Sequence, residues 1–226
     1  MNIICKPGDI VIFHGSQQNP ATALFTHTGV IVEANPEIKL LEMVNGTMLL
    51  GALHSSLRYG TVYRVYAGDD AEPDTVQGAE DCAYEVAVTA KYWMLRFDVG
   101  ISWDEKSFKT LHNPYSLSSI FSSALGSSAF GPKAQEYANY LNVSCQTFPP
   151  EELEDYKRGF FSGTICSYIP VALYQAVCGP LLSAYIMALD ARRVLPRSLG
   201  WYLGHHTLWQ ALGPGKIRPD RKGVVR

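Results

Sequence analysis

The chain contains 226 residues, of which 47% are hydrophobic and 18% are charged, and its formal net charge is −2. These values are typical of a globular protein with a full hydrophobic core, and they argue against a disordered chain. Since the charges nearly balance, nothing in the composition indicates a nucleic acid as the main partner.

The first third of the chain has the apolar runs and turn signals of β-structure. The runs are separated by Pro-Gly, Asn-Pro and Asn-Gly pairs, which favour turns. The predicted strands span residues 9–13, 26–33, 38–44 and 61–66. Because the connections are short and polar, we predict an antiparallel meander.

The rest of the chain is predicted to be mainly helical. The apolar spacing indicates helices over residues 76–97, 115–125, 132–141, from about 165 to 178, 181–193 and 199–212. Gly179-Pro180 is expected to divide the apolar segment 165–189 into two core helices, which argues against a membrane span. The expected fold class is therefore α+β, in a single domain over residues 1–226 with a helical insertion over about 76–163.

The N-terminal residues lack the basic segment and the long apolar run of a secretory signal peptide. We therefore expect the protein to be cytoplasmic in the cell that produces it. The five cysteines are widely and irregularly spaced, which fits neither a disulfide framework nor a zinc motif. Since metal-ligand spacing and a glycine-rich phosphate loop are both absent from the sequence, we expect no metal and no other cofactor.

Cys166 lies at the expected start of the apolar helix that runs through residues 171–177. Unpaired backbone N–H groups and the positive end of the helix dipole would favour a thiolate there. Thr164 or Ser162 could cap the helix, and Pro170 is early enough to be tolerated. Taken alone, such a cysteine is more often a small apolar core residue, so its interpretation depends on a partner.

A thiol nucleophile needs a base, and His27 is the best candidate among the six histidines. It lies at the start of a predicted strand, where side-chain alternation places His27, Gly29 and Ile31 on one face. The small Gly29 would leave room beside His27 for a helix end or a substrate. The remaining histidines are expected in loops or on a C-terminal amphipathic helix: His14, His54, His112, His205 and His206.

The carboxylate that could orient His27 is Glu42, on the next predicted strand. We suppose that the strands before and after the Asn-Pro turn pair as a hairpin in which Ala34 lies opposite Glu37. In that register Gly29 lies opposite Glu42, so Glu42 is a diagonal neighbour of His27, at about 7–8 Å between backbones. A slip of one residue would turn Glu42 to the other face, where it would be an ordinary exposed strand carboxylate.

These segments together resemble the permuted papain-like enzymes of the NlpC/P60 superfamily. The resemblance rests on the order of four segments: Gly8-Asp9-Ile10-Val11-Ile12-Phe13, Phe25-Thr26-His27-Thr28-Gly29-Val30-Ile31-Val32, Leu40-Leu41-Glu42 and Ile165-Cys166-Ser167. In the branch with YiiX-like amidases and the lecithin–retinol acyltransferase group, the histidine strand precedes the cysteine helix. The resemblance implies a circularly permuted papain-like fold, in which an antiparallel meander packs against the nucleophile-bearing helix.

The resemblance also implies a role for each candidate residue: Cys166 as nucleophile, His27 as base and Glu42 as the group that orients the base. The implied activity is that of a cysteine peptidase or amidase that cleaves an amide bond, in this superfamily often in peptidoglycan stem peptides. Two alternatives stay open: an acyltransferase or lipid amide or ester hydrolase with the same fold, and a non-catalytic binding protein. A wall-directed enzyme without a signal peptide would fit an antibacterial effector, a toxin exported by a dedicated secretion system.

Overall fold

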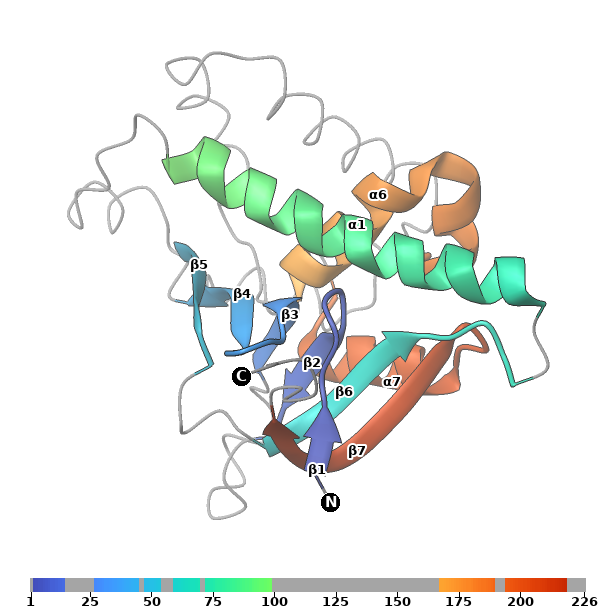
Figure 1. Cartoon of the computed structure of the whole chain (residues 1–226), viewed down its shortest axis with the longest axis horizontal. Coiled ribbons are helices and arrows are strands. Elements are labelled where there is room, and N and C mark those ends of the chain that lie inside the picture. The colour runs from blue at the N-terminus through green and yellow to red at the C-terminus, as the bar shows by residue number, and fades with distance from the viewer. Residues whose placement is uncertain are drawn as a thin grey trace. The chain divides into compact units, whose positions relative to one another are not determined.

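The computed structural model describes residues 2–14, 27–44, 47–53, 59–69, 72–98, 167–189 and 194–218. Contacts within the chain define two compact units. The first comprises Met1–Glu42, Leu50–Val88 and Pro196–Arg226, and the second comprises Met43–Leu49 and Thr89–Leu195. The described residues combine a curled seven-stranded sheet with three helices, which confirms the mixed α and β content expected from the sequence (Figure 1). The assignment of one domain with an insertion over about 76–163 stays a prediction.

The sheet has the strand order β1-β7-β6-β2-β3-β4-β5. Its strands are Asn2–Ile4 (β1), Ile10–Phe13 (β2), His27–Glu33 (β3), Lys39–Val44 (β4), Thr47–Ala52 (β5), Tyr59–Val65 (β6) and Trp209–Arg218 (β7). β1 runs parallel to β7, whereas β6 pairs antiparallel with both β7 and β2. The predicted antiparallel meander is thus correct for β2, β3 and β4 but wrong for β6, which returns to lie beside β2.

Three strands were missed from the sequence, and one predicted helix extends too far. β1 is only three residues long, and both β5 and β7 contain glycine, which weakens a strand pattern. The helix predicted over 199–212 is wrong beyond residue 205, because α7 spans Pro196–His205 and β7 begins at Trp209. β7 pairs with β1 on one side and β6 on the other, and these backbone hydrogen bonds outweigh the helical spacing.

A buried apolar cluster covers one face of the sheet in the first unit. Val11 lies opposite Gly29 on one neighbouring strand and opposite Val62 on the other, so the three share this face. The cluster contains Ile3, Cys5, Val11, Phe13, Ile31, Ala34, Ile38, Leu40, Val62 and Ile217. Each large side chain buried here stabilises the fold by about 1.5–3 kcal/mol. His27 lies opposite Phe13, so it belongs to the same face.

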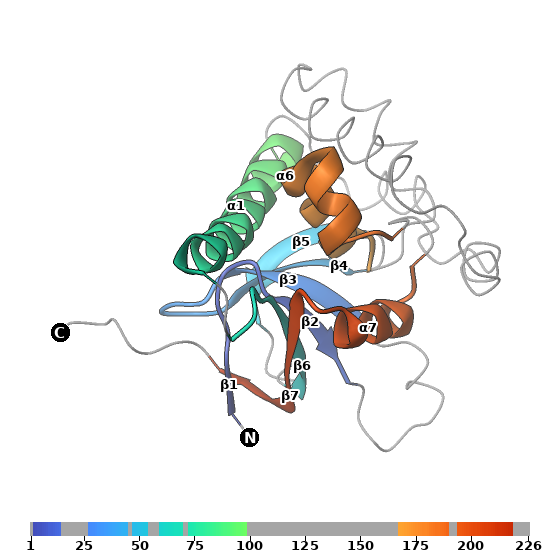
Figure 2. The ribbon, with the colours of Figure 1, turned by 90° about the vertical axis from the view of Figure 1, so that its right-hand side faces the viewer.

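Helix α7 covers the opposite face of β2 and β6 (Figure 2). A Cβ atom added to Gly200 would lie 2.9 Å from Cδ1 of Ile12 and 3.4 Å from the hydroxyl of Tyr63. Leu199 and Leu203 of the same helix are buried. β2 is therefore covered on both faces, which explains why all four of its residues are buried.

Helix α1 spans Pro73–Asp98, and this confirms the helix predicted over 76–97. Its N-terminal part lies against the turn between β1 and β2. Gly8 in that turn has φ +87°, and an added Cβ would lie only 2.3 Å from the carbonyl oxygen of Ala83. Close by, Lys6 forms an ion pair with Glu80 at 3.1 Å. Both the backbone conformation and the close approach of the helix therefore require glycine at position 8.

In the second unit, helix α6 spans Tyr168–Ile186 without interruption at Gly179-Pro180. The predicted break there, and the separate helix over 181–193, are wrong. A proline inside a helix costs about 3 kcal/mol, but every residue from 169 to 176 is buried, and this burial offsets the loss. Beyond the last helical residue, Ile186, the buried Gln175 amide donates to the carbonyl groups of Met187, at 2.8 Å, and Leu189, at 2.5 Å.

Two other predictions concern segments for which the structure gives no description. The helices predicted over 115–125 and 132–141 lie outside the described residues, as does the predicted insertion beyond residue 98. Among the helices that are described, none is long and apolar enough to cross a membrane.

Candidate catalytic site

His27 and Glu42 form a direct side-chain contact on one face of the sheet. His27 is the first residue of β3 and Glu42 lies within β4, and Nε2 of His27 is 2.5 Å from Oε2 of Glu42. The exposed fractions of the two side chains are 22% and 17%. A charge-assisted hydrogen bond in such a half-buried setting is stronger than a fully exposed one. The contact therefore holds the imidazole in a defined orientation.

The strand register that produces this contact is the one predicted from the Asn-Pro turn. Gly29 lies directly opposite Glu42, which makes Glu42 the diagonal neighbour of His27 on the same face. The sequence alone therefore predicted both the partner and the side of the sheet.

The prediction fails only near the turn itself. The register shifts between Ile31 and Glu33, so that Glu33 pairs with Lys39, where the predicted register would place residue 38. Ala34 and Glu37 lie outside the strands and do not form the predicted pair. Since the irregularity lies on the turn side of Ile31, the pairing nearer to His27 is unchanged.

The aromatic ring of Phe13 packs against His27, a contact that the sequence did not predict. The two residues are cross-strand partners in β2 and β3, with ring centroids 5.9 Å apart and ring planes inclined by 21°. Phe13 is buried and belongs to the apolar cluster. The connection between β2 and β3 is too long for turn chemistry to determine the register, so this pairing could not be inferred locally.

The role predicted for Gly29 is wrong. An added Cβ at this position would lie 2.8 Å from the Cγ and Cδ1 atoms of Leu40 and from the carbonyl oxygen of Leu41. The space beside Gly29 is therefore filled by the neighbouring strand, and it offers no room for a helix end or a substrate. Glycine serves here to let β3 and β4 pack closely beside His27.

The atom through which His27 contacts Glu42 determines how the ring could act. With Nε2 directed at the carboxylate, a proton on Nε2 would be donated to Glu42, and Nδ1 would be the basic nitrogen. The carboxylate would also stabilise the imidazolium that forms when Nδ1 accepts a proton. Such a pair is suited to take a proton from a thiol, a hydroxyl group or water, and to return it to a leaving group.

The predicted nucleophile, Cys166, lies outside the described residues. Helix α6 begins at Tyr168, whereas the sequence pattern placed Cys166 in its first turn. The residue that directly precedes the helix is Ser167, which is fully buried, and its hydroxyl donates to the carbonyl oxygen of Val194. This hydroxyl is thus hydrogen-bonded to the segment that directly precedes α7. The predicted N-caps, Thr164 and Ser162, also lie outside the described residues.

The other histidines have structural partners or are not described. Nε2 of His14 lies 2.8 Å from the hydroxyl of Thr61, and His14 itself is exposed after β2, as a residue at the rim. At the end of α7, the ring of His205 stacks on Trp201 with centroids 4.6 Å apart. His54 and His112 lie outside the described residues. In the described segments, we find no group of three or more His, Cys, Asp or Glu residues that could hold a metal ion.

The Gly8-Asp9 segment has a structural role in the first unit. Asp9 is 1% exposed, and its carboxylate accepts hydrogen bonds from Nε and Nη2 of Arg64 at 2.8 and 2.7 Å. It also accepts one from the backbone N–H of Lys6 at 2.7 Å. Burial raises the pKa of the Asp9 carboxyl group, and the hydrogen bonds from Arg64 oppose this shift. The segment thus joins the β1–β2 turn to β6.

The thiol of Cys5 is expected to be much less reactive than a catalytic thiol. Burial, and secondarily the nearby charge of Asp9, raises the pKa of the Cys5 thiol to about 12. At neutral pH the group is therefore protonated and a poor nucleophile. Three cysteines have described side chains, Cys5, Cys82 and Cys178, and none of these three forms a disulfide bond.

No protein-family model, curated protein or solved structure matches this chain.

Proposed function

We propose that the protein is a cysteine-dependent amidase or peptidase with a circularly permuted papain-like fold. Cys166 would be the nucleophile, His27 the general base and acid, and Glu42 the group that orients His27. The observation that carries the proposal is the contact of 2.5 Å between Nε2 of His27 and Glu42. It joins the two residues that the resemblance to the NlpC/P60 superfamily assigns to base and orienting group.

The proposed reaction begins with transfer of the Cys166 thiol proton to Nδ1 of His27. The thiolate then attacks the carbonyl carbon of an amide, and the carbonyl electron pair moves to oxygen. The backbone N–H of Cys166 would help to stabilise this oxyanion. When the intermediate collapses, the C–N bond breaks and His27 returns the proton to the leaving amine. Water, deprotonated by His27, then hydrolyses the thioester and regenerates the thiol.

Glu42 contributes by keeping Nδ1 available for this cycle. Its carboxylate accepts the Nε2 proton, so the neutral imidazole is held in the tautomer that can take a proton at Nδ1. When the imidazolium forms, the negative charge of Glu42 stabilises it at a distance of 2.5 Å. The same logic applies to other histidine bases that are oriented by a carboxylate.

The proposal is tested by the reactivity of the thiols towards iodoacetamide near neutral pH. Native protein, His27→Ala and Cys166→Ala are labelled for increasing times, and each cysteine is quantified by peptide mass spectrometry. We expect Cys166 to react faster than Cys5, Cys82, Cys145 and Cys178, and this excess to be lost in His27→Ala. Equal rates at all five cysteines, or a His27→Ala variant with unchanged labelling, would refute the assignment.

The substrate class is tested separately, once the reactive thiol is established. The proposed substrates are amides, including the stem peptides of peptidoglycan. Mass spectrometry of digested peptidoglycan and of a panel of lipid amides and acyl donors, with Cys166→Ala as the blank, would identify the bond that is cleaved. Products from the acyl donors alone would replace amide hydrolysis with acyl transfer on the same thiol.

A further inference from the structure

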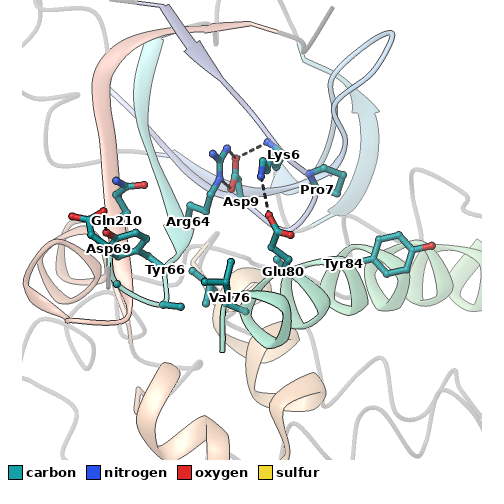
Figure 3. A pocket seen from close by; sticks show the side chains of 15 residues that line it. Lys6, Pro7, Asp9, Arg64, Tyr66, Asp69, Val76, Glu80, Tyr84 and Gln210 are labelled. Atoms are coloured by element: carbon teal, nitrogen blue, oxygen red, sulfur yellow. Dashed lines mark hydrogen bonds and ion pairs between the residues drawn. The ribbon is translucent and has the colours of Figure 1, made fainter. Parts of the chain in front are cut away.

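A cavity in the first unit lies at the opposite end of β2 from His27. Phe13, which contacts His27, is the last residue of β2, whereas Asp9, which lines the cavity, precedes its first residue. The cavity has a volume of about 450 Å³ and lies between the β1–β2 turn, the segment after β6 and one side of α1 (Figure 3). This volume is within the range of small-molecule sites.

The lining of the cavity includes a cationic group, the guanidinium of Arg64, which is held by several hydrogen bonds. Arg64 uses Nε and Nη2 to bind the buried carboxylate of Asp9, and Nη2 also donates to the carbonyl oxygen of Ile4 at 3.0 Å. In the part of the chain that the structure describes, no residue accepts a hydrogen bond from Nη1. The Arg64 side chain is 23% exposed. Nη1 can therefore donate a hydrogen bond to an anionic group of a ligand, while Nε and Nη2 keep the guanidinium in place.

One ion pair at the cavity contributes little stability and can be replaced by contacts with a ligand. Nζ of Lys6 lies 3.1 Å from Glu80, and both side chains are 56% exposed (Figure 3). An exposed ion pair of this kind contributes at most about 1 kcal/mol. A ligand that carries both an anionic and a cationic group can replace this contact with two of its own. Lys6 then pairs with the ligand anion and Glu80 with the ligand cation.

The remaining walls add apolar surface and a second acidic group. Val76, Ala79 and Ala83 lie along α1 at helical spacing and form a wall of small side chains. On another side, the hydroxyl of Tyr66 donates to Asp69. A simple anion would face the carboxylates of Glu80 and Asp69, and a simple cation would face Lys6 and Arg64. The arrangement therefore selects against a ligand with charge of one sign.

We propose that this cavity binds a small zwitterion, an α-amino acid with an aliphatic side chain. The carboxylate would be held by Lys6 and Arg64, the ammonium group by Glu80, and the side chain would lie along the α1 wall. The proposal does not depend on the chemistry at His27, since it uses none of the same residues.

The test uses leucine together with leucinamide, which lacks the carboxylate, and N-acetylleucine, which lacks the ammonium group. Binding to the full chain is followed by amide chemical shifts in two-dimensional NMR. We expect saturable shifts with leucine, and at least about tenfold weaker binding for each blocked ligand, because each loses a charge-assisted contact.

Two variants assign the ends of the ligand. Lys6→Met should reduce the preference for leucine over leucinamide, and Glu80→Gln should reduce the preference for leucine over N-acetylleucine. Lys39→Met is the matched control, because Lys39 forms another exposed ion pair, with Glu33, away from the cavity. These side chains are exposed or half-buried at the surface, so we expect all three variants to fold. Unchanged melting curves would verify this.

The proposal is overturned by any of three results. The first is the absence of saturable shifts with leucine up to its solubility. The second is equal binding of the three ligands, and the third is leucine binding that Lys6→Met and Glu80→Gln leave unchanged.

Discussion

The orientation of His27 depends on two side chains of opposite character. Phe13 packs against the ring without taking a hydrogen bond, whereas Glu42 binds Nε2 through a charge-assisted contact. The aromatic contact restricts where the ring lies, and the carboxylate selects which nitrogen carries the proton. A substitution at Glu42 should therefore change proton transfer more than it changes ring position.

Glu42→Gln tests this distinction, because the amide keeps an oxygen acceptor but loses the negative charge. We expect the rate of Cys166 alkylation near neutral pH to fall by about 10- to 100-fold, which corresponds to loss of a charged hydrogen bond worth about 1.5–3 kcal/mol. Glu33→Gln is the control, since Glu33 lies on β3 and forms an exposed ion pair with Lys39. Equal rates for the native protein and Glu42→Gln would show that Glu42 has no role in activating the thiol.

Cys5 makes the stability of the fold depend on pH in the alkaline range. Burial raises the pKa of its thiol from the ordinary value of 9.0 to about 12 in the folded chain. Between these values the folded state holds the proton that the unfolded state releases, so stability falls as pH rises. Urea unfolding at pH 8, 9 and 10 should show a steeper loss for the native protein than for Cys5→Ala. Parallel pH profiles of the two proteins would contradict this assignment.

At the scale of single elements, the parts that sequence predicted well are those determined by local chemistry. The β3–β4 hairpin joins strands across a short turn, so its register could be derived, and with it the partner of His27. α1 also follows from its apolar spacing. β7 could not be derived, because it is stabilised by two neighbours distant in sequence, β1 and β6. The continuity of α6 through Pro180 likewise depends on burial, which no local signal reports.

The packing of the β1–β2 turn on α1 gives a prediction for this pair of elements. Gly8→Ala would place a side chain at a positive φ, with its Cβ only 2.3 Å from the backbone carbonyl oxygen of Ala83. Gly68 also has a positive φ, +100°, but nothing lies within 4 Å of an added Cβ there. We expect Gly68→Ala to cost about 1–2 kcal/mol, and Gly8→Ala at least about 2 kcal/mol more, because the backbone of α1 must shift. Chemical unfolding of both variants measures the difference. Equal losses would mean that the turn does not need to lie this close to α1.

At the scale of the whole molecule, the charge balance limits how a substrate can be recognised. With 19 basic and 21 acidic residues, the chain has a net charge of only −2, which would do little to steer a polyanion or a polycation from a distance. Recognition must then come from local groups, and the proposed activity should depend only weakly on ionic strength. The compartment in which the substrate lies is therefore a better guide to its identity than its overall charge.

The compartment in which the chain is harmful separates the proposed substrates, because peptidoglycan lies outside the inner membrane of a bacterium whereas cytoplasmic amides do not. The chain is expressed in a bacterial host with and without an added export signal, each as the native form and as Cys166→Ala. If stem peptides are the substrate, exported native protein should lyse the cells or arrest their growth, while the cytoplasmic form and both Cys166→Ala forms are tolerated. Toxicity confined to the cytoplasm would place the substrate there. Equal tolerance of exported native and exported Cys166→Ala protein, at matched levels of folded protein, would argue against attack on the wall, since the thiol would then make no difference in the compartment where the wall is exposed.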